Sequence, residues 1–136
     1  MKKTSILILI LSFFLIVACS DDDDNQDCIN YEEIANVTSV EAPQTATINQ
    51  PVDVTVNFRV NNGCGEFAQF DESLMETTRT IAVEAIYDGC ACTQVITDRT
   101  ITYSFTPLVS GEHVLRFRSG EEEFIEARIM VEDPSE

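Results

Sequence analysis

Strict alternation of apolar and polar residues is the feature that most constrains the fold of this chain. Five apolar residues recur at every second position: Val52, Val54, Val56, Phe58 and Val60. Positions two apart share one face of a β-strand, so the segment predicts a strand with one buried face. Similar alternation recurs, more weakly in the last two cases, over 80–87, 94–105, 112–118, 123–131, 34–40 and 45–48. About seven short strands predict an all-β fold, an antiparallel β-sandwich.

Turn residues separate these segments, and one stretch between them breaks the pattern. Asn61-Asn62-Gly63 and Asp88-Gly89 end two strands, and Ser119-Gly120 predicts a tight hairpin between the last two. Within 66–76 the spacing of Phe67, Phe70 and Leu74 is that of a helix turn. We therefore expect a long loop there with a short helical turn. The length of 136 residues is enough for one domain.

The first 19 residues have the pattern of a secretory signal. Lys2 and Lys3 precede an apolar run from Ile6 to Val17, which ends in Ala18-Cys19. The run is shorter than the roughly 20 residues that a transmembrane helix needs. The segment resembles the lipobox of bacterial lipoproteins. That resemblance implies cleavage before Cys19, lipid on its thiol and acylation of the new amino terminus, so that the protein meets the membrane through a lipid anchor.

An acidic run follows the cysteine: Ser20, Asp21, Asp22, Asp23 and Asp24. A serine and several aspartates at this place resemble the surface export signal of Bacteroidetes-type lipoproteins. The resemblance implies an outer-membrane protein, lipid-anchored and exposed at the cell surface; a spacer facing the periplasm is the alternative. The expected organisation is a signal peptide at 1–18, a lipidated acidic tether at 19–27 and a β-sandwich domain at 28–136.

The segment from Tyr103 to Phe117 resembles the penultimate-strand pattern of bacterial immunoglobulin-like domains. Phe105-Thr106-Pro107 is followed by Gly111 and then by an alternating strand. His113 stands where those domains commonly carry an aromatic residue. The resemblance implies an immunoglobulin-like sandwich, a fold that hosts many unrelated functions.

Four cysteines remain in the domain: Cys28, Cys64, Cys90 and Cys92. An even number in a small exported domain predicts two disulfides. A Cys90–Cys92 bridge would be strained, because the two side chains project to the same side. Cys28 and Cys64 therefore each take one of the pair, and we favour Cys64 with Cys92 and Cys28 with Cys90. The export context and the lack of Cys-x-x-Cys spacing argue against a metal or redox site, so no metal and no cofactor are expected.

Charge and residue content argue against two classes of function, nucleic-acid binding and catalysis. Eight Lys and Arg stand against 24 Asp and Glu, so the surface repels phosphate backbones and nucleic acid is not an expected partner. His113 is the only histidine, and acidic pairs such as Asp71 and Glu72 or the run 121–123 arise by chance in so acidic a chain. We therefore expect that this protein is not an enzyme.

The remaining expectation is a non-catalytic binding module for a protein or a glycan. Phe67 and Phe70 lie in the predicted loop, where exposed aromatic rings would mark a contact surface. The alternative role for these two rings is to cap one end of the core. The alternative function is that of a structural accessory subunit in a periplasmic or outer-membrane envelope complex.

Overall fold

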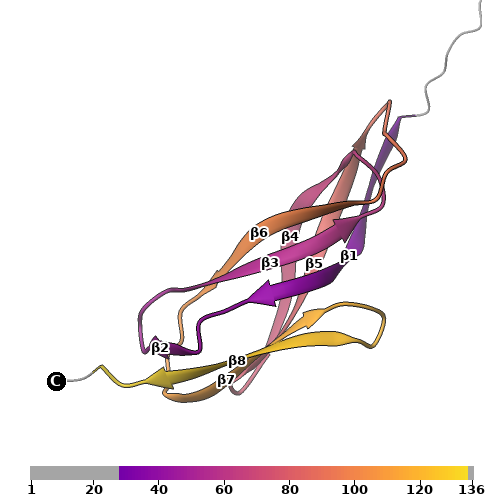
Figure 1. Ribbon diagram of the computed structural model, residues 1–136. Helices are drawn as coiled ribbons and strands as arrows, with labels where there is room; N and C mark the ends of the chain where they lie inside the picture. Colours follow the sequence, from indigo (N-terminus) through magenta and orange to yellow (C-terminus); the bar gives the residue numbers. More distant parts are fainter. Residues whose placement is uncertain (1–27, 135–136) are drawn as a thin grey trace, which may run out of the picture.

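The computed structural model describes residues 28–134, which fold into an all-β sandwich (Figure 1). Eight strands follow one another: β1 (Ile29–Glu41), β2 (Thr45–Thr47), β3 (Val52–Val60), β4 (Gly65–Met75), β5 (Thr78–Gly89), β6 (Thr97–Phe105), β7 (Gly111–Arg118) and β8 (Phe124–Glu132). β1 begins at one end of the molecule and β8 ends at the other. Within the described residues no helix is long and apolar enough to cross a membrane.

Two sheets form the layers of the sandwich. In the first, β5 pairs with β4 along one side and with β1 and β7 along the other, and β8 and β2 continue beyond β7. In the second, β3 lies between β1 and β6. The edge strands β4 and β6 therefore lie on the same side of the sandwich, where the two sheets approach each other.

β1 belongs to both sheets. Its first part, Ile29–Ala35, pairs with β5, and its second part, from Asn36, pairs with β3. A register shift between Val37 and Ser39 accompanies the transfer, as expected where a strand bends from one sheet into the other. β5 consequently changes neighbours along one side, because β7 pairs with residues 78–81 and β1 with residues 83–89.

The core lies between the sheets and is built from alternating residues of the long strands. Its fully buried members come from β3, β5, β7 and β8: Val54, Val56, Phe58, Val60, Ile81, Val83, Ala85, Tyr87, Leu115, Phe117, Ile129 and Val131. The alternation of β3 predicts its buried face position by position, because residues 52, 54, 56, 58 and 60 are all buried.

The all-β sandwich predicted from the alternation is confirmed, with differences in detail. There are eight strands rather than seven, since the stretch 65–75 adds β4. Two neighbouring pairs, β5 with β7 and β2 with β8, are parallel. β6 begins at Thr97 rather than at 94, because Cys92 lies in the connecting segment, where a disulfide fixes it.

The expectation of a loop with a helical turn over 66–76 is wrong. The segment is the edge strand β4, paired with β5 from Gly65 to Met75. A register shift between Phe67 and Gln69 inserts an extra residue there. In a regular strand Phe67 and Phe70 would face opposite sides, but the bulge turns both toward the core. A bulged strand thus reproduces the three-residue spacing that suggests a helix.

The connection between β7 and β8 is also longer than the tight turn expected at Ser119-Gly120. Strand pairing ends at Arg118 and Phe124, and residues 119–123 form the loop between them. The amide of Ser119 donates to the carbonyl oxygen of Glu123 at 2.9 Å, which closes this loop. The longer loop carries Glu121 to the edge of a cleft.

Candidate functional site

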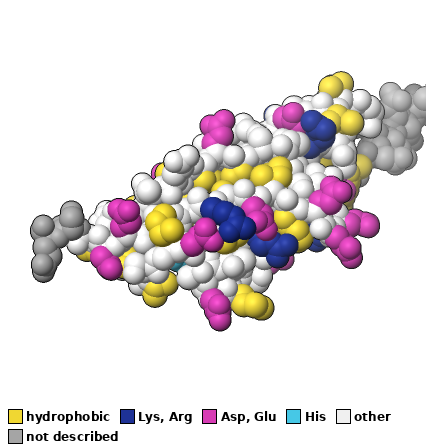
Figure 2. Space-filling model, turned by 60° about the horizontal axis from the view of Figure 1, so that its bottom comes forward, with side chains coloured by type: hydrophobic (Ala, Val, Ile, Leu, Met, Phe, Trp, Pro, Cys, Tyr) yellow, Lys and Arg dark blue, Asp and Glu magenta, His cyan; other side chains and the backbone are white. Residues whose placement is uncertain are grey.

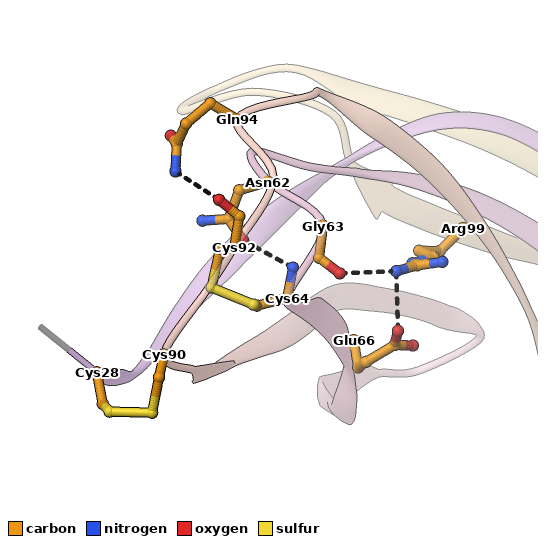
Figure 3. Close-up of a disulfide and its surroundings, with 9 residues drawn as sticks. All are labelled: Cys28, Asn62, Gly63, Cys64, Glu66, Cys90, Cys92, Gln94 and Arg99. Atoms are coloured by element: carbon orange, nitrogen blue, oxygen red, sulfur yellow. Dashed lines mark hydrogen bonds and ion pairs between the residues drawn. A yellow bond between two sulfur atoms is a disulfide. The ribbon is translucent and has the colours of Figure 1, made fainter. Parts of the chain in front are cut away.

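The end of the molecule where β1 begins is held by two disulfides (Figure 3). Cys28 is bonded to Cys90 and Cys64 to Cys92, with Cα atoms 3.8 Å and 5.3 Å apart. Two disulfides are the number that the even cysteine count predicts, and the pairing is the one favoured from the sequence. The first ties the start of β1 to the end of β5, and the second ties the β3–β4 turn to the segment after β5.

Polar contacts reinforce this end. Arg99 of β6 donates from Nε to the carbonyl oxygen of Gly65 at 3.1 Å and from Nη2 to that of Gly63 at 3.4 Å. The same guanidinium pairs with Glu66 at 2.8 Å, as Figure 3 shows. The side-chain oxygen of Asn62 accepts from the amide of Cys64 at 2.9 Å. Arg99 thus joins the two edge strands across the open side of the sandwich.

Tyr87 anchors the same end from inside the core. Its ring is fully buried and stacks on Tyr31 at 4.8 Å between ring centroids. Its hydroxyl oxygen accepts from the amide of Asn61 at 2.9 Å. Burial raises the pKa of Tyr87 to about 12, an effect that the hydrogen bond from Asn61 partly opposes and the nearby Glu33 carboxylate reinforces. The hydroxyl is therefore neutral throughout the physiological range.

The predicted lipidation site Cys19 and the predicted export signal, Ser20 with Asp21, Asp22, Asp23 and Asp24, lie outside the described residues. The described chain starts at Cys28, beside the disulfides. A tether attached there would join the domain at its disulfide-bonded end.

Phe67 and Phe70 pack against the core rather than standing in an exposed loop. Both are partly buried. Their ring centroids are 4.8 Å apart, and the row continues to Phe58 on one side and to Tyr103 on the other. This is the core arrangement given above as the alternative to a contact surface, and its physical cause is the bulge in β4. The two rings close the side of the sandwich between β4 and β6.

His113 and Glu72, two of the residues weighed as catalytic candidates, are engaged in contacts within the fold. His113 is buried, and its Nε2 lies 2.9 Å from the carbonyl oxygen of Val109. The hydroxyl of buried Tyr103 donates to a carboxylate oxygen of Glu72, and Arg79 lies 3.4 Å from that carboxylate. Burial, followed by the contact with Glu72, raises the pKa of Tyr103 above its ordinary value.

A cleft of about 230 Å³ opens on the outer face of the first sheet. Its lining comes from four strands and one loop: Asp71, Glu72, Ser73, Thr80, Ala82, Arg118, Glu121 and Phe124. The register places these residues in rows across the sheet, with Asp71 opposite Ala82, Ser73 opposite Thr80 and Arg118 opposite Phe124. The small residues of β5 form the floor, and longer side chains stand on both sides.

The crossover of β1 creates this cleft. Ala82 is the residue of β5 that lies between its pairing with β7 and its pairing with β1. Beyond this point β1 and the β7–β8 hairpin diverge, which leaves space above a methyl side chain. β4 and β7 flank β5 at one strand spacing each, so the walls stand roughly 10 Å apart. The opening is thus a consequence of the topology.

Arg118 differs from every other arginine of the described chain. The other five have carboxylate partners within 3.4 Å: Arg59 with Asp98, Arg79 with Glu72, Arg99 with Glu66, Arg116 with Glu126, and Arg128 with Glu112 and Glu126. Figure 2 shows arginines lying directly against carboxylates on one face. Arg118 has no such partner among residues 28–134, and its Nε donates to the carbonyl oxygen of Gly120 at 3.0 Å. Its remaining guanidinium donors are available to the cleft.

The polar side chains of the floor and of the opposite wall are equally unengaged. The side chains of Asp71, Ser73 and Thr80 make no hydrogen bond to another described residue, although their backbones belong to strands. Phe124 is partly buried, and the guanidinium of Arg116 lies over its ring at 4.2 Å from the centroid. The cleft thus offers a cation, hydroxyls, carboxylates and an aromatic ring. That combination suits the binding of a small polar molecule.

A family model described as the ORF11 beta-sandwich domain matches residues 54–128, more than half of the chain. The chain belongs to the ORF11 beta-sandwich family. The region shared with this family runs from β3 into β8, so it contains every residue that lines the cleft. No curated protein and no solved structure matches the chain.

Sequence reasoning missed the cleft. In the sequence, Asp71 and Glu121 look like any other of the 24 acidic residues, and Arg118 stands in no motif. Alternation does place Arg116 and Arg118 on the polar face of their strand. The parallel pairing of β5 with β7, which brings Arg118 into the same cleft as Asp71, has no signal in a single sequence.

Proposed function

We propose that this protein is an exported lipoprotein whose β-sandwich works as a non-catalytic binding module. Cys19 carries the lipid, the run Ser20–Asp24 directs the protein through the outer membrane, and the domain is displayed at the cell surface. This is the organisation of Bacteroidetes-type surface lipoproteins. The ligand is a glycan or a protein.

The sequence of the first 24 residues and the disulfides of the domain support export and anchoring. The charged start, the short apolar run and Ala18-Cys19 fit a lipoprotein signal. Disulfides persist in oxidising compartments outside the cytoplasm, so a domain with all four of its cysteines bonded suits that destination. Several acyl chains would make the anchor permanent, since one chain alone binds a membrane only marginally.

The single observation that carries the binding role is the cleft with Arg118. In a chain where carboxylates outnumber Lys and Arg three to one, an arginine finds a carboxylate partner easily. Arg118 has none among the described residues and faces hydroxyl and carboxylate groups that are also unengaged. Polar groups that make no contact within the fold, including the remaining donors of Arg118, are available for a ligand.

A structural accessory role is the second candidate, favoured by the outer edge of β6. Among residues 28–134 this nine-residue strand pairs with β3 alone. An unpaired edge can receive a strand from a partner. Crosslinking in cells followed by co-purification would reveal a stoichiometric envelope partner, whereas a binding module would yield none.

Labelling with an alkyne fatty acid tests the anchor. Wild-type protein should incorporate the label and remain with membranes, and Cys19→Ala should lose both properties because its acceptor thiol is gone. Cys28→Ala is the matched control, since it removes a cysteine of the domain and should keep the label. Labelling of the Cys19→Ala protein would overturn the lipobox assignment.

Protease shaving of intact cells tests the location. The domain should be lost while a periplasmic marker survives. A variant with Asp21, Asp22, Asp23 and Asp24 all changed to Asn should keep its lipid yet become protected, because the export signal has been removed. Protection of the wild-type domain until the outer membrane is opened would reject surface display and direct attention to the periplasm.

A further inference from the structure

We infer that the Arg118 cleft binds an acidic sugar: a single pyranose unit that carries one carboxylate and several hydroxyl groups, within or at the end of a glycan. This inference rests on the proposed binding function and names its ligand class. It is argued from the charge, the polar groups, the ring and the size of the cleft.

The charge of the cleft selects an anionic group and limits its number. Arg118 supplies guanidinium donors that suit a carboxylate, whose two oxygens can accept parallel hydrogen bonds. Asp71, Glu72 and Glu121 line the same cleft and would repel a second negative charge. A ligand with one carboxylate satisfies both conditions, and a polyanion does not.

The floor and the wall opposite Arg118 together select hydroxyl groups. Ser73 and Thr80 face each other across β4 and β5, and each offers a hydroxyl that both donates and accepts. The carboxylate of Asp71, one row along, only accepts hydrogen bonds, so its preferred partners are hydroxyl donors. Neighbouring hydroxyls on one ring can engage this row together, whereas a simple carboxylic acid has nothing to offer it.

The remaining lining suits the ring itself. Ala82 presents only a methyl group at the floor, so a ring can approach the sheet closely. Phe124, over whose ring Arg116 lies, adds the exposed part of its ring as an apolar surface beside Arg118. The volume of about 230 Å³ is below the range of roughly 300–1,000 Å³ typical of sites for drug-sized ligands. It accommodates one sugar unit, with the neighbouring units of a glycan in solvent.

The test uses three probes that separate these contributions: methyl β-glucuronide, its neutral twin methyl β-glucoside, and acetate. The isotope-labelled, lipidated protein in detergent micelles is titrated with each probe, and NMR follows the Arg118 Nε–H group and the amides of Thr80 and Ala82. The glucuronide should shift all three signals saturably. The glucoside and acetate should bind about tenfold more weakly, because each lacks one half of the recognised chemistry.

Variants assign the site. Arg118→Gln should weaken glucuronide binding about tenfold, and Ala82→Leu should abolish it by filling the floor while keeping the arginine. Arg128→Gln is the matched control on the same face, since its guanidinium pairs with Glu112 and Glu126, and it should bind like wild type. Thermal unfolding of each variant checks that the fold is retained, so a lost shift reports the site.

The contrary outcomes are distinct. Equal binding of acetate and glucuronide would reduce the cleft to an anion site and overturn the sugar. Equal binding of the glucoside would remove the role of Arg118. Shifts that survive in the Arg118→Gln and Ala82→Leu variants would overturn the cleft assignment while leaving the binding function in place. If intact cells displaying wild-type protein capture nothing from arrays of acidic and neutral glycans or from an array of proteins, the proposed function itself fails.

Discussion

The disulfide-bonded end and the Arg118 cleft use their polar groups in opposite ways. At the disulfide end Arg99 contacts two carbonyl oxygens and a carboxylate, and the Tyr87 hydroxyl is hydrogen-bonded inside the fold. In the cleft the guanidinium of Arg118 has no carboxylate partner among the described residues. The hydroxyls of Ser73 and Thr80 make no hydrogen bond to another described residue. At the disulfide-bonded end the polar groups are engaged in contacts that stabilise the fold, and in the cleft they remain available to a ligand. On the proposed function, recognition and stability are therefore carried by different residues of one small sandwich.

Removal of a disulfide should lower the free energy of unfolding more than any other change considered, because it weakens the more stable of the two regions. The bonds close loops with sequence separations of 62 and 28 residues. Chain-entropy arguments give about 4 kcal/mol for the first and about 3.5 kcal/mol for the second. The double variants Cys28→Ala/Cys90→Ala and Cys64→Ala/Cys92→Ala should lower the free energy of unfolding in urea by these amounts. A loss below about 1 kcal/mol in both would show that the polar contacts alone hold this end.

Gly65→Ala should be the next most damaging change. A Cβ at this position would lie 2.5 Å from Cβ of Val60 and 2.8 Å from the ring of Tyr87, and both of those side chains are fully buried. Because neither can move away, overpacking should cost about 1–3 kcal/mol in urea unfolding. Gly120→Ala is the control, since its new Cβ meets the flexible side chain of Glu123. Equal costs for the two would mean that the disulfide end is not tightly packed.

Alkaline pH should destabilise the protein at its disulfide-bonded end, because the buried hydroxyl of Tyr87 ionises less readily in the folded protein than in the unfolded chain. Its pKa is about 12 in the folded protein and about 10 when unfolded. A raised folded pKa means that its stabilising contribution is complete below pH 10 and is lost as the pH rises from 10 to 12. The free energy of unfolding, measured by urea titration at successive pH values, should fall across that window. Tyr87→Phe should show a smaller fall, the remainder coming from Tyr103; an unchanged slope would exclude Tyr87 as a cause.

Two arginine variants compare the regions directly and carry the smallest effects. Arg99→Gln removes charge-assisted hydrogen bonds to the β3–β4 turn and should cost about 1 kcal/mol. Arg118→Gln should change the free energy of unfolding by less than about 0.5 kcal/mol, as expected for a surface residue without an ion pair. If Arg118→Gln proves the more costly of the two, its guanidinium serves the fold and the distinction between the regions fails.

Regular alternation made much of the fold predictable. The buried face of β3 follows from sequence alone, because its apolar residues are two apart and the strand has no bulge. Alternation does not predict β4, because an extra residue between Phe67 and Gln69 shifts the face on which later side chains lie. A bulge of this kind is set by the neighbouring strand, which a local pattern does not contain.

The cleft was less predictable for a related reason. Its residues come from segments up to 53 residues apart, from Asp71 to Phe124, and they meet only because β7 pairs parallel to β5 and β1 leaves that sheet next to Ala82. Each of Asp71, Ser73 and Arg118 is an ordinary polar residue on an exposed strand face. Their significance lies in which neighbours they have and which they lack, and both depend on tertiary structure.

The bond from Cys28 to Cys90 also has a mechanical consequence. A pull on the chain before Cys28 would, without the bond, load the end of β1 and open its hydrogen bonds with β5 one after another. The disulfide passes the load directly into β5, the central strand of its sheet, whose flanking strands share it in shear. Hydrogen bonds loaded together resist more force than those broken in sequence. A domain held at this end and pulled by a large ligand would therefore keep its sheets, and its cleft, intact under load.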